Sequence, residues 1–228
     1  MITCEFLGRL GNNMFQIACT YAVANKYKDT VGFPDFPYFN LPKRQTEPEN
    51  FFIQRTGPNN IPDIKHKKNL CLVGFFQRYE VFDNIKQELI ENVFKVPQDW
   101  HPNTIAVHVR RGDFANNTED FPMQPVSYYM QALEMLNYKN KQVIFCSDDI
   151  PWCKKNFPFA SFREKTSPID DIYFIANCES VVMSNSTFSF WGAYLNMQQR
   201  KIIFPMHWFS LKSGRNGYEI CPGNWIGI

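Results

Sequence analysis

Short apolar segments alternate with amphipathic segments over the second half of the chain, and this alternation constrains the fold more than any other feature. Apolar runs bounded by polar or turn residues are typical of buried strands, and they occur at 105–109, 142–146, 180–183 and 201–204. Segments with helical spacing or helix-start signals separate them, at 125–137, 150–157, 168–175 and 187–198. Alternating strands and helices predict a largely parallel, doubly wound α/β sheet.

The first half of the chain contains one clear unit of the same kind. A predicted strand at 2–7 leads into the glycine loop Gly8–Asn13, and apolar residues at helical spacing follow from Met14. A Pro-bearing region at 32–68 has little periodicity, and a predicted strand at 70–76 and a predicted helix at 81–94 come after it. The turn-forming segment 97–102 then separates two predicted domains, 1–100 and 101–228.

Bulk composition excludes several classes of protein. A net charge of +2 gives no basis for nucleic-acid binding, and the seven cysteines include no Cys-x-x-Cys pair. Most of these thiols lie in apolar patterns, where a free thiol behaves as a small hydrophobe, so we expect a reducing compartment. The four histidines show no metal-ligand spacing. With no signal peptide and no apolar run of about 20 residues, we expect a cytoplasmic protein without a transmembrane segment or a metal.

Polar residues gather where the predicted strand 105–109 ends. His108 lies near its end, and Arg110, Arg111, Gly112 and Asp113 follow it. In open α/β sheets this carboxyl edge is where ligands bind. Because the guanidinium group is always charged and its planar fork suits phosphate oxygens, a phosphorylated ligand is the first hypothesis. Surface ion pairs are the alternative interpretation.

Two further strands end in polar loops that belong to the same predicted edge. Ser147–Asp149 follows the strand 142–146, and a carboxylate there can accept paired N–H donors such as the edge of guanine. Alternatively, Asp148 or Asp149 caps the helix before Trp152. Ser184–Ser189 follows the strand 180–183 and brings four hydroxyls and an amide to a helix N-terminus, which is a natural phosphate cradle. One of these hydroxyls is expected to be an ordinary helix cap.

Four blocks, in order along the chain, resemble the α-1,2-fucosyltransferases, the glycosyltransferase family with an H-x-R-R-G-D motif. They are GRLGNNMFQIACTYA (8–22), HVRRGDF (108–114), FCSDDIPWCKKNF (145–157) and DIYFIANCESVVMSNSTFSFWGAYLN (171–196). The resemblance implies a GT-B-like architecture of two Rossmann-like halves. Because the chain is short for two full halves, we expect the acceptor-side half, 1–100, to be trimmed, and the resemblance implies that the half 101–228 binds the GDP-sugar. It also implies inverting, metal-independent transfer of L-fucose from GDP-β-L-fucose to a sugar hydroxyl of an oligosaccharide acceptor, usually the 2-OH of galactose, with no cofactor.

The resemblance also implies roles for individual residues. It places Arg110 on the GDP phosphates with His108 beside it, Asp148 on guanine, Ser186 and Thr187 on the phosphates, and Asn12, Asn185 and Phe188 in the substrate site. Asp113 is the nearest candidate for the base that takes the acceptor proton; alternatively it orients Arg110 or Arg111 through an ion pair. Two other functions remain open: transfer of another sugar from a GDP-hexose, and a non-catalytic module that binds nucleotides or glycans.

Overall fold

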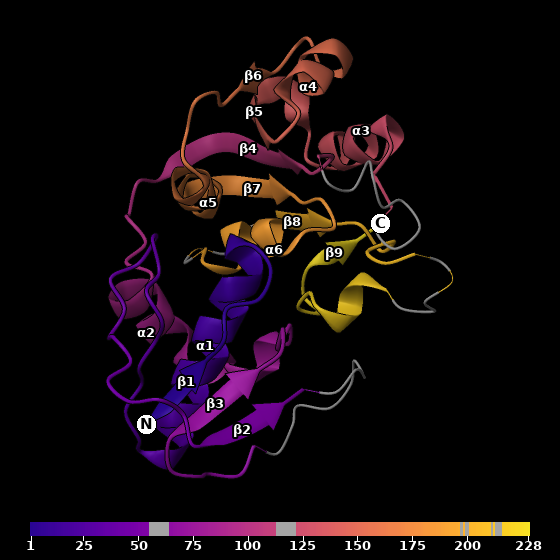
Figure 1. Ribbon diagram of the computed structural model, residues 1–228. Coiled ribbons are helices and arrows are strands. Elements are labelled where there is room, and N and C mark those ends of the chain that lie inside the picture. Colours follow the sequence, from indigo (N-terminus) through magenta and orange to yellow (C-terminus); the bar gives the residue numbers. More distant parts are fainter. Residues whose placement is uncertain (55–63, 113–121, 197, 199–200, 211, 213–215) are drawn as a thin grey trace. The chain divides into compact units, whose positions relative to one another are not determined.

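The computed structural model describes residues 1–54, 64–112, 122–196, 198, 201–210, 212 and 216–228. The chain divides into two compact units, Met1–Val96 and Pro97–Ile228 (Figure 1). Asp113, the candidate base, lies outside the described residues. This division does not test the functions predicted for the two halves, which remain predictions.

The second unit is built on a six-stranded sheet with strand order β6-β5-β4-β7-β8-β9, in which each neighbouring pair is parallel. The strands are β4 (His101–Val109), β5 (Gln142–Ser147), β6 (Ser161–Phe162), β7 (Cys178–Val182), β8 (Lys201–Phe204) and β9 (Ile226–Gly227). The helices between them are α3 (Val126–Met135), α4 (Ile150–Asn156), α5 (Pro168–Asn177) and α6 (Thr187–Tyr194). The predicted alternation of strands and helices and the parallel sheet are therefore confirmed.

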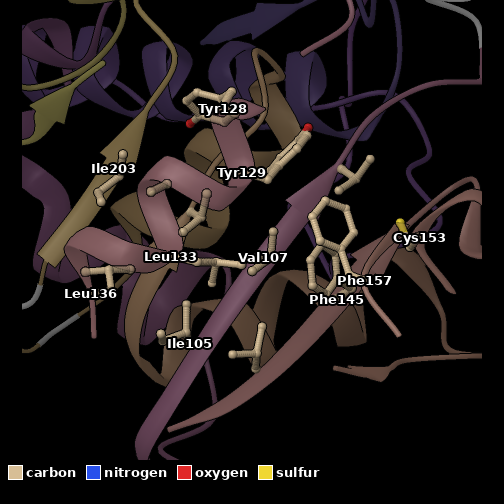
Figure 2. Close-up of a cluster of buried hydrophobic side chains, with 14 residues drawn as sticks. Ile105, Val107, Tyr128, Tyr129, Leu133, Leu136, Phe145, Cys153, Phe157 and Ile203 are labelled. Atoms are coloured by element: carbon tan, nitrogen blue, oxygen red, sulfur yellow. The ribbon is translucent and has the colours of Figure 1, made fainter. Parts of the chain in front are cut away.

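The two faces of strand β4 serve different purposes. Ile105 and Val107 pack with Phe145 of β5 and with Tyr129 and Leu133 of α3 in a buried apolar cluster (Figure 2). Because successive strand residues point to opposite faces, Ala106 and His108 project to the other side of the sheet. A polar side chain near the end of β4 thus lies on the face opposite this core.

The start of helix α5 follows its sequence signals closely. Ser167 is the N-cap and accepts a hydrogen bond from the amide of Asp170, whose carboxylate in turn accepts from the amide of Ser167. Pro168 occupies the first helical position, where its missing N–H costs nothing. This reciprocal capping satisfies backbone donors that the first helical turn leaves unpaired, as the sequence predicted.

The first unit has a smaller parallel sheet in the order β1-β3-β2. Its strands are β1 (Ile2–Cys4), β2 (Asn50–Ile53) and β3 (Leu70–Val73). Helix α1 (Leu10–Tyr27) begins inside the predicted loop Gly8–Asn13, four residues before the predicted start at Met14. The predicted helix is confirmed, but its residues are buried without interruption from Asn13 to Thr20, so this part of α1 is covered on all sides and not on one apolar face alone. All seven cysteines are buried free thiols, two in this sheet and two in β5 and β7.

The structure corrects the helix predicted at 81–94. The segment is a series of short turns instead: Tyr79–Val81 and Asp83–Ile85 are 3₁₀ turns, α2 (Lys86–Glu88) is a single α-turn, and Leu89–Val93 is a π turn. The apolar positions are buried as the spacing predicted, among them Phe82, Leu89 and Val93. Periodicity identifies which side chains are buried, but it does not specify whether the backbone forms 3₁₀, α or π hydrogen bonds.

Candidate functional site

The three polar loops predicted to share a ligand do lie at one edge of the sheet. Strand β4 lies between β5 and β7, with Val109 paired to Ser147 of β5 and Val107 paired to Val182 of β7. All three strands run parallel, so their carboxyl ends coincide. The residues that follow them are therefore neighbours across the sheet, as expected where α/β proteins bind ligands.

Asp148 organises the loop that follows β4. Its carboxylate accepts from the backbone N–H groups of Arg111, at 2.9 Å, and Gly112, at 3.0 Å, and it pairs with the Arg110 guanidinium at 2.9 Å. A Cβ on Gly112 would lie 2.7 Å from a carboxylate oxygen of Asp148, so a glycine permits this close approach. The contact fixes Arg110 at the sheet edge. Guanine reading, the role that the resemblance implies for Asp148, remains a prediction.

Asp149 is the helix cap that the alternative interpretation of this loop predicted. Its side chain accepts from the backbone N–H of Trp152 at 3.1 Å, at the start of α4. The same carboxylate pairs with Nε of Arg111 at 3.1 Å, and the Arg111 guanidinium lies 4.2 Å from the centre of the Trp152 ring. The two arginines therefore have different surroundings: Arg111 is held between a carboxylate and an aromatic face, and Arg110 is held by Asp148.

His108 is the centre of a buried hydrogen-bonded cluster that the sequence did not reveal. Its Nδ1 lies 2.9 Å from Oγ of Ser184 and 2.5 Å from Oγ of Ser189, and the two hydroxyl oxygens are 3.0 Å apart. Its ring stacks on Phe188 at a centroid distance of 4.9 Å. Burial, together with the nearby Arg110 charge, lowers the pKa of His108 to about 3, so the imidazole is neutral at pH 7.

The cluster uses two of the four hydroxyls that follow β7, and a third is a helix cap. Ser184 and Ser189 are bonded to His108, and Ser186 is the N-cap of α6, accepting from the backbone N–H of Phe188 at 3.3 Å. Thr187 is half-buried at the first position of the helix. The predicted phosphate cradle is thus reduced to Ser186, Thr187 and the N-terminal amides of α6.

Asn185 is buried and tied to other loops of the same unit. Its side-chain amide donates to the carbonyl oxygens of Pro122, at 2.9 Å, and Trp208, at 3.0 Å. Its own side-chain oxygen is buried and has no hydrogen-bond partner among the described residues. These contacts hold the loop after β7 against two neighbouring segments, so Asn185 has a clear structural role there.

Asn12 belongs to the first unit and lies in the first turn of α1, which starts at Leu10. Its side-chain oxygen accepts from the amide of Gln77 at 2.9 Å. Gly8 has a φ of +78°, and a Cβ at that position would lie 2.4 Å from the Asn12 side-chain nitrogen. The glycine therefore permits both the left-handed backbone and the close approach of Asn12.

The described residues show neither a metal-binding cluster nor a membrane-spanning helix. Among those residues, no group of three or more His, Cys, Asp or Glu side chains could hold a metal ion. No helix within the described ranges is both long enough and apolar enough to span a bilayer.

Sequence comparisons connect the chain to known glycosyltransferases. Residues 37–228 match the model of glycosyl transferase family 11. The chain is 28% identical over 216 residues to an α-1,2-colitosyltransferase of Escherichia coli, an alignment that covers 85% of this chain and 72% of that protein. It is 31% identical over 237 residues to galactoside 2-α-L-fucosyltransferase SEC1 of Bos taurus, covering 86% of this chain and 64% of that protein.

Structural comparisons agree with the sequence comparisons at the level of fold. The structure is similar to the α-1,6-fucosyltransferase NodZ crystallised with GDP, with a TM-score of 0.51 and 15% identity over 84% of this chain and 91% of that one. It is also similar to POFUT1 in complex with GDP, with a TM-score of 0.55 and 11% identity over 88% and 96% of the two chains. The predicted GT-B-like fold is thereby confirmed, and the family match over residues 37–228 shows that this chain belongs to glycosyl transferase family 11.

Proposed function

We propose that the chain transfers L-fucose from GDP-β-L-fucose to the 2-OH of a galactose in an oligosaccharide acceptor, with inversion at the anomeric carbon and without a metal. One observation carries this proposal: Arg110, His108 and the N-terminus of α6 meet at the carboxyl ends of the neighbouring strands β4 and β7. Positive charge and N–H donors converge there on a position suited to a diphosphate.

The proposed chemistry needs stabilisation of the departing GDP. The bond between the anomeric carbon and the phosphate oxygen breaks, and GDP leaves with the bonding electron pair. The acceptor oxygen forms the new bond to the opposite face of the sugar and loses its proton to a base. Arg110 and the amides at the start of α6, near Ser186 and Thr187, would meet the negative charge that develops on the diphosphate. Asp113 is the proposed base, on the strength of its place in the H-x-R-R-G-D motif.

The remaining predicted residues complete the proposed substrate site. Phe188 already stacks on the His108 ring, so the two form one aromatic wall at the sheet edge. Asp148 is proposed to contact guanine in addition to the backbone groups it holds, and Asn185 to contribute through the loop it anchors. Asn12 is proposed to contact substrate; the half 1–100, to which it belongs, is proposed to bind the acceptor, and the half 101–228 is proposed to bind the donor.

A different donor sugar is the second candidate function. The relative from Escherichia coli is named for transfer of colitose through the same α-1,2 linkage. The sequence comparison therefore fits transfer of more than one sugar by this chemistry, and the roles proposed for the donor-side residues concern the phosphates and the base and leave the hexose unassigned.

A panel of nucleotide sugars tests both candidates. The protein is incubated with GDP-fucose, GDP-mannose, nucleotide-activated colitose and UDP-galactose, each with lactose or N-acetyllactosamine, and released nucleotide and glycoside product are measured. We expect nucleotide release and product with GDP-fucose above all others. Preferred turnover of another GDP-sugar would replace the donor assignment. Nucleotide binding with neither transfer nor donor hydrolysis across the whole panel would favour a non-catalytic binding module.

A further inference from the structure

The hydrogen-bonded cluster around His108 joins three elements of the second unit. His108 is the penultimate residue of β4, Ser184 follows β7, and Ser189 lies in the first turn of α6. The side chains are almost inaccessible, with exposed fractions of 5% for His108 and 0% for each serine. Two hydroxyls hold one edge of the imidazole and the Phe188 ring covers one of its faces.

The hydrogen atoms of the cluster can be counted. Each serine hydroxyl has one hydrogen to donate, and a neutral imidazole has one protonated and one unprotonated nitrogen. Oγ of Ser189 already accepts the backbone N–H of Ser184 at 3.1 Å. Within the described part of the chain, the hydroxyls of Ser184 and Ser189 have no hydrogen-bond partners beyond these groups and His108 Nδ1.

Only one of the two neutral tautomers gives both buried serine hydroxyls an acceptor for their hydrogens. If Nδ1 carries the hydrogen, it donates to one serine oxygen. One of the two hydroxyls can then donate to the other, but the second hydroxyl hydrogen has no acceptor. If Nδ1 is unprotonated, one hydroxyl donates to Nδ1 and the other donates to the first hydroxyl. A buried hydroxyl left without an acceptor is strongly unfavourable, so the cluster selects the tautomer with unprotonated Nδ1.

We propose that Ser184 and Ser189 are positioning residues that hold His108 in the tautomer with its hydrogen on Nε2, so that the imidazole offers a neutral N–H donor to an oxygen of the bound nucleotide sugar. In this state Nε2 has no lone pair, so His108 cannot be the base that takes the acceptor proton. The tautomer follows from the cluster itself; the contact with a nucleotide sugar rests on the proposed function.

The electrostatic surroundings agree with a neutral imidazole. Burial and the Arg110 charge both disfavour the imidazolium form and lower the pKa of His108. A second cation beside Arg110 would add attraction for phosphate, but the buried site would have to hold two like charges. A neutral N–H donor gives directional binding without that repulsion.

The tautomer can be measured on the free protein. Long-range ¹H–¹⁵N correlation spectra of histidine-labelled protein at pH 7 distinguish a protonated from an unprotonated ring nitrogen, and the spectrum of His108→Gln identifies which of the four histidines is His108. We expect an unprotonated Nδ1 and a protonated Nε2. In Ser184→Ala/Ser189→Ala we expect the population to move toward protonated Nδ1. A wild-type spectrum with Nδ1 protonated, or with an imidazolium, overturns the proposal.

Binding of GDP tests the consequence for the ligand. The amide nitrogen of a glutamine reaches about as far as Nε2, and that of an asparagine about as far as Nδ1, so His108→Gln should keep more GDP affinity than His108→Asn. Loss of one hydrogen bond corresponds to roughly a tenfold difference in Kd by calorimetry. The double serine variant should also bind GDP more weakly, whereas Ser180→Ala, which removes another buried hydroxyl from the same unit, should bind normally.

The two arms separate this proposal from the proposed function. If wild-type protein has the expected tautomer but binds no GDP, the donor assignment fails and the tautomer assignment stands. If GDP binds wild type, but binds equally well to His108→Asn, His108→Gln and the double serine variant, the donor role of Nε2–H is wrong. If the double variant does not fold, the wild-type spectrum and the two His108 variants still decide the question.

Discussion

Replacing Asp148 tests whether this carboxylate holds the arginine loop or reads the base. Asp148→Ala removes the acceptor for the backbone N–H groups of Arg111 and Gly112, at 2.9 and 3.0 Å, and the partner of Arg110. The loop is partly exposed, so water can replace part of each bond. We therefore take about 1 kcal/mol for each backbone hydrogen bond and up to about 1 kcal/mol for the ion pair.

The expected loss of unfolding free energy is thus about 2–3 kcal/mol. For a chain of this length each kcal/mol lowers Tm by about 2–4 °C, so Asp148→Ala should melt about 4–12 °C below wild type. Asp148→Asn should lose less, because its remaining oxygen can still accept one of the two N–H groups. The other N–H loses its acceptor, since an NH₂ group cannot accept a hydrogen bond. Thermal melts and GDP calorimetry on both variants measure the stability loss and the weakened phosphate binding together.

The matched control is Asp149→Asn, which removes the neighbouring carboxylate and leaves the Arg110 contact intact. Asparagine is also a good helix cap, so α4 should keep its start and GDP binding should change little. Inosine diphosphate separates loop holding from base reading, because it lacks the 2-amino group of guanine. If Asp148→Ala melts like wild type and loses only its preference for GDP over inosine diphosphate, the loop-holding role is refuted.

Three further predictions concern glycines and acid stability. Gly112→Ala places a Cβ 2.7 Å from an Asp148 oxygen and should weaken GDP binding, read by calorimetry; unchanged affinity would show that the loop adapts. Gly192→Ala places a Cβ 2.6 Å from a side-chain carbon of α5 and should cost about 1–3 kcal/mol in urea unfolding, whereas Gly223→Ala, with nothing within 4 Å, should be neutral; equal stabilities would contradict this packing. The folded pKa of His108, about 3, lies below its unfolded value, so the unfolded state binds the proton first and stability falls as the pH drops from about 6.5 toward 3. By pH 5 the loss is about 2 kcal/mol, and His108→Gln should remove this part of the slope; an identical slope in that variant would exclude His108 as its source.

The strands and helices of the second unit were predictable because their signals are local. Val, Ile and Phe runs identify β4, β5, β7 and β8, and the Ser167 and Asp170 capping pair identifies the start of α5. Three strands were missed. β6 and β9 have only two residues each, too few for periodicity, and β2 is an edge strand inside a region rich in proline.

Helix α6 also ended earlier than its sequence predicted. The apolar pattern continues to about Gln198, but the helix ends at Tyr194 and the buried Asn196 side chain accepts the backbone N–H of Gln198 at 2.9 Å. A polar side chain that bonds to the backbone offers the chain an alternative to another helical turn. The sequence pattern alone does not show which of these two sets of bonds forms.

The site was predictable as a set of loops but not as a set of contacts. Strand ends in a parallel sheet lie together by topology, so the neighbourhood of Arg110, Asp148 and Ser186 followed from the alternation of elements. The bonding partners depend on strand register and helix rotation, which bring Ser184 and Ser189 to His108. One signal was present in the sequence. His108 is an even-numbered residue of the strand, so its side chain must lie on the face opposite the core that contains Ile105 and Val107.

The most direct test of the proposed donor site is the rate of fucose transfer from GDP-fucose to N-acetyllactosamine by Arg110→Ala and wild-type protein. Arg110 contributes a partly exposed ion pair with Asp148, so its loss should cost at most about 1 kcal/mol of stability. The account predicts a folded variant whose turnover falls by at least about 10²–10³. A folded Arg110→Ala protein that transfers fucose at close to the wild-type rate would contradict it.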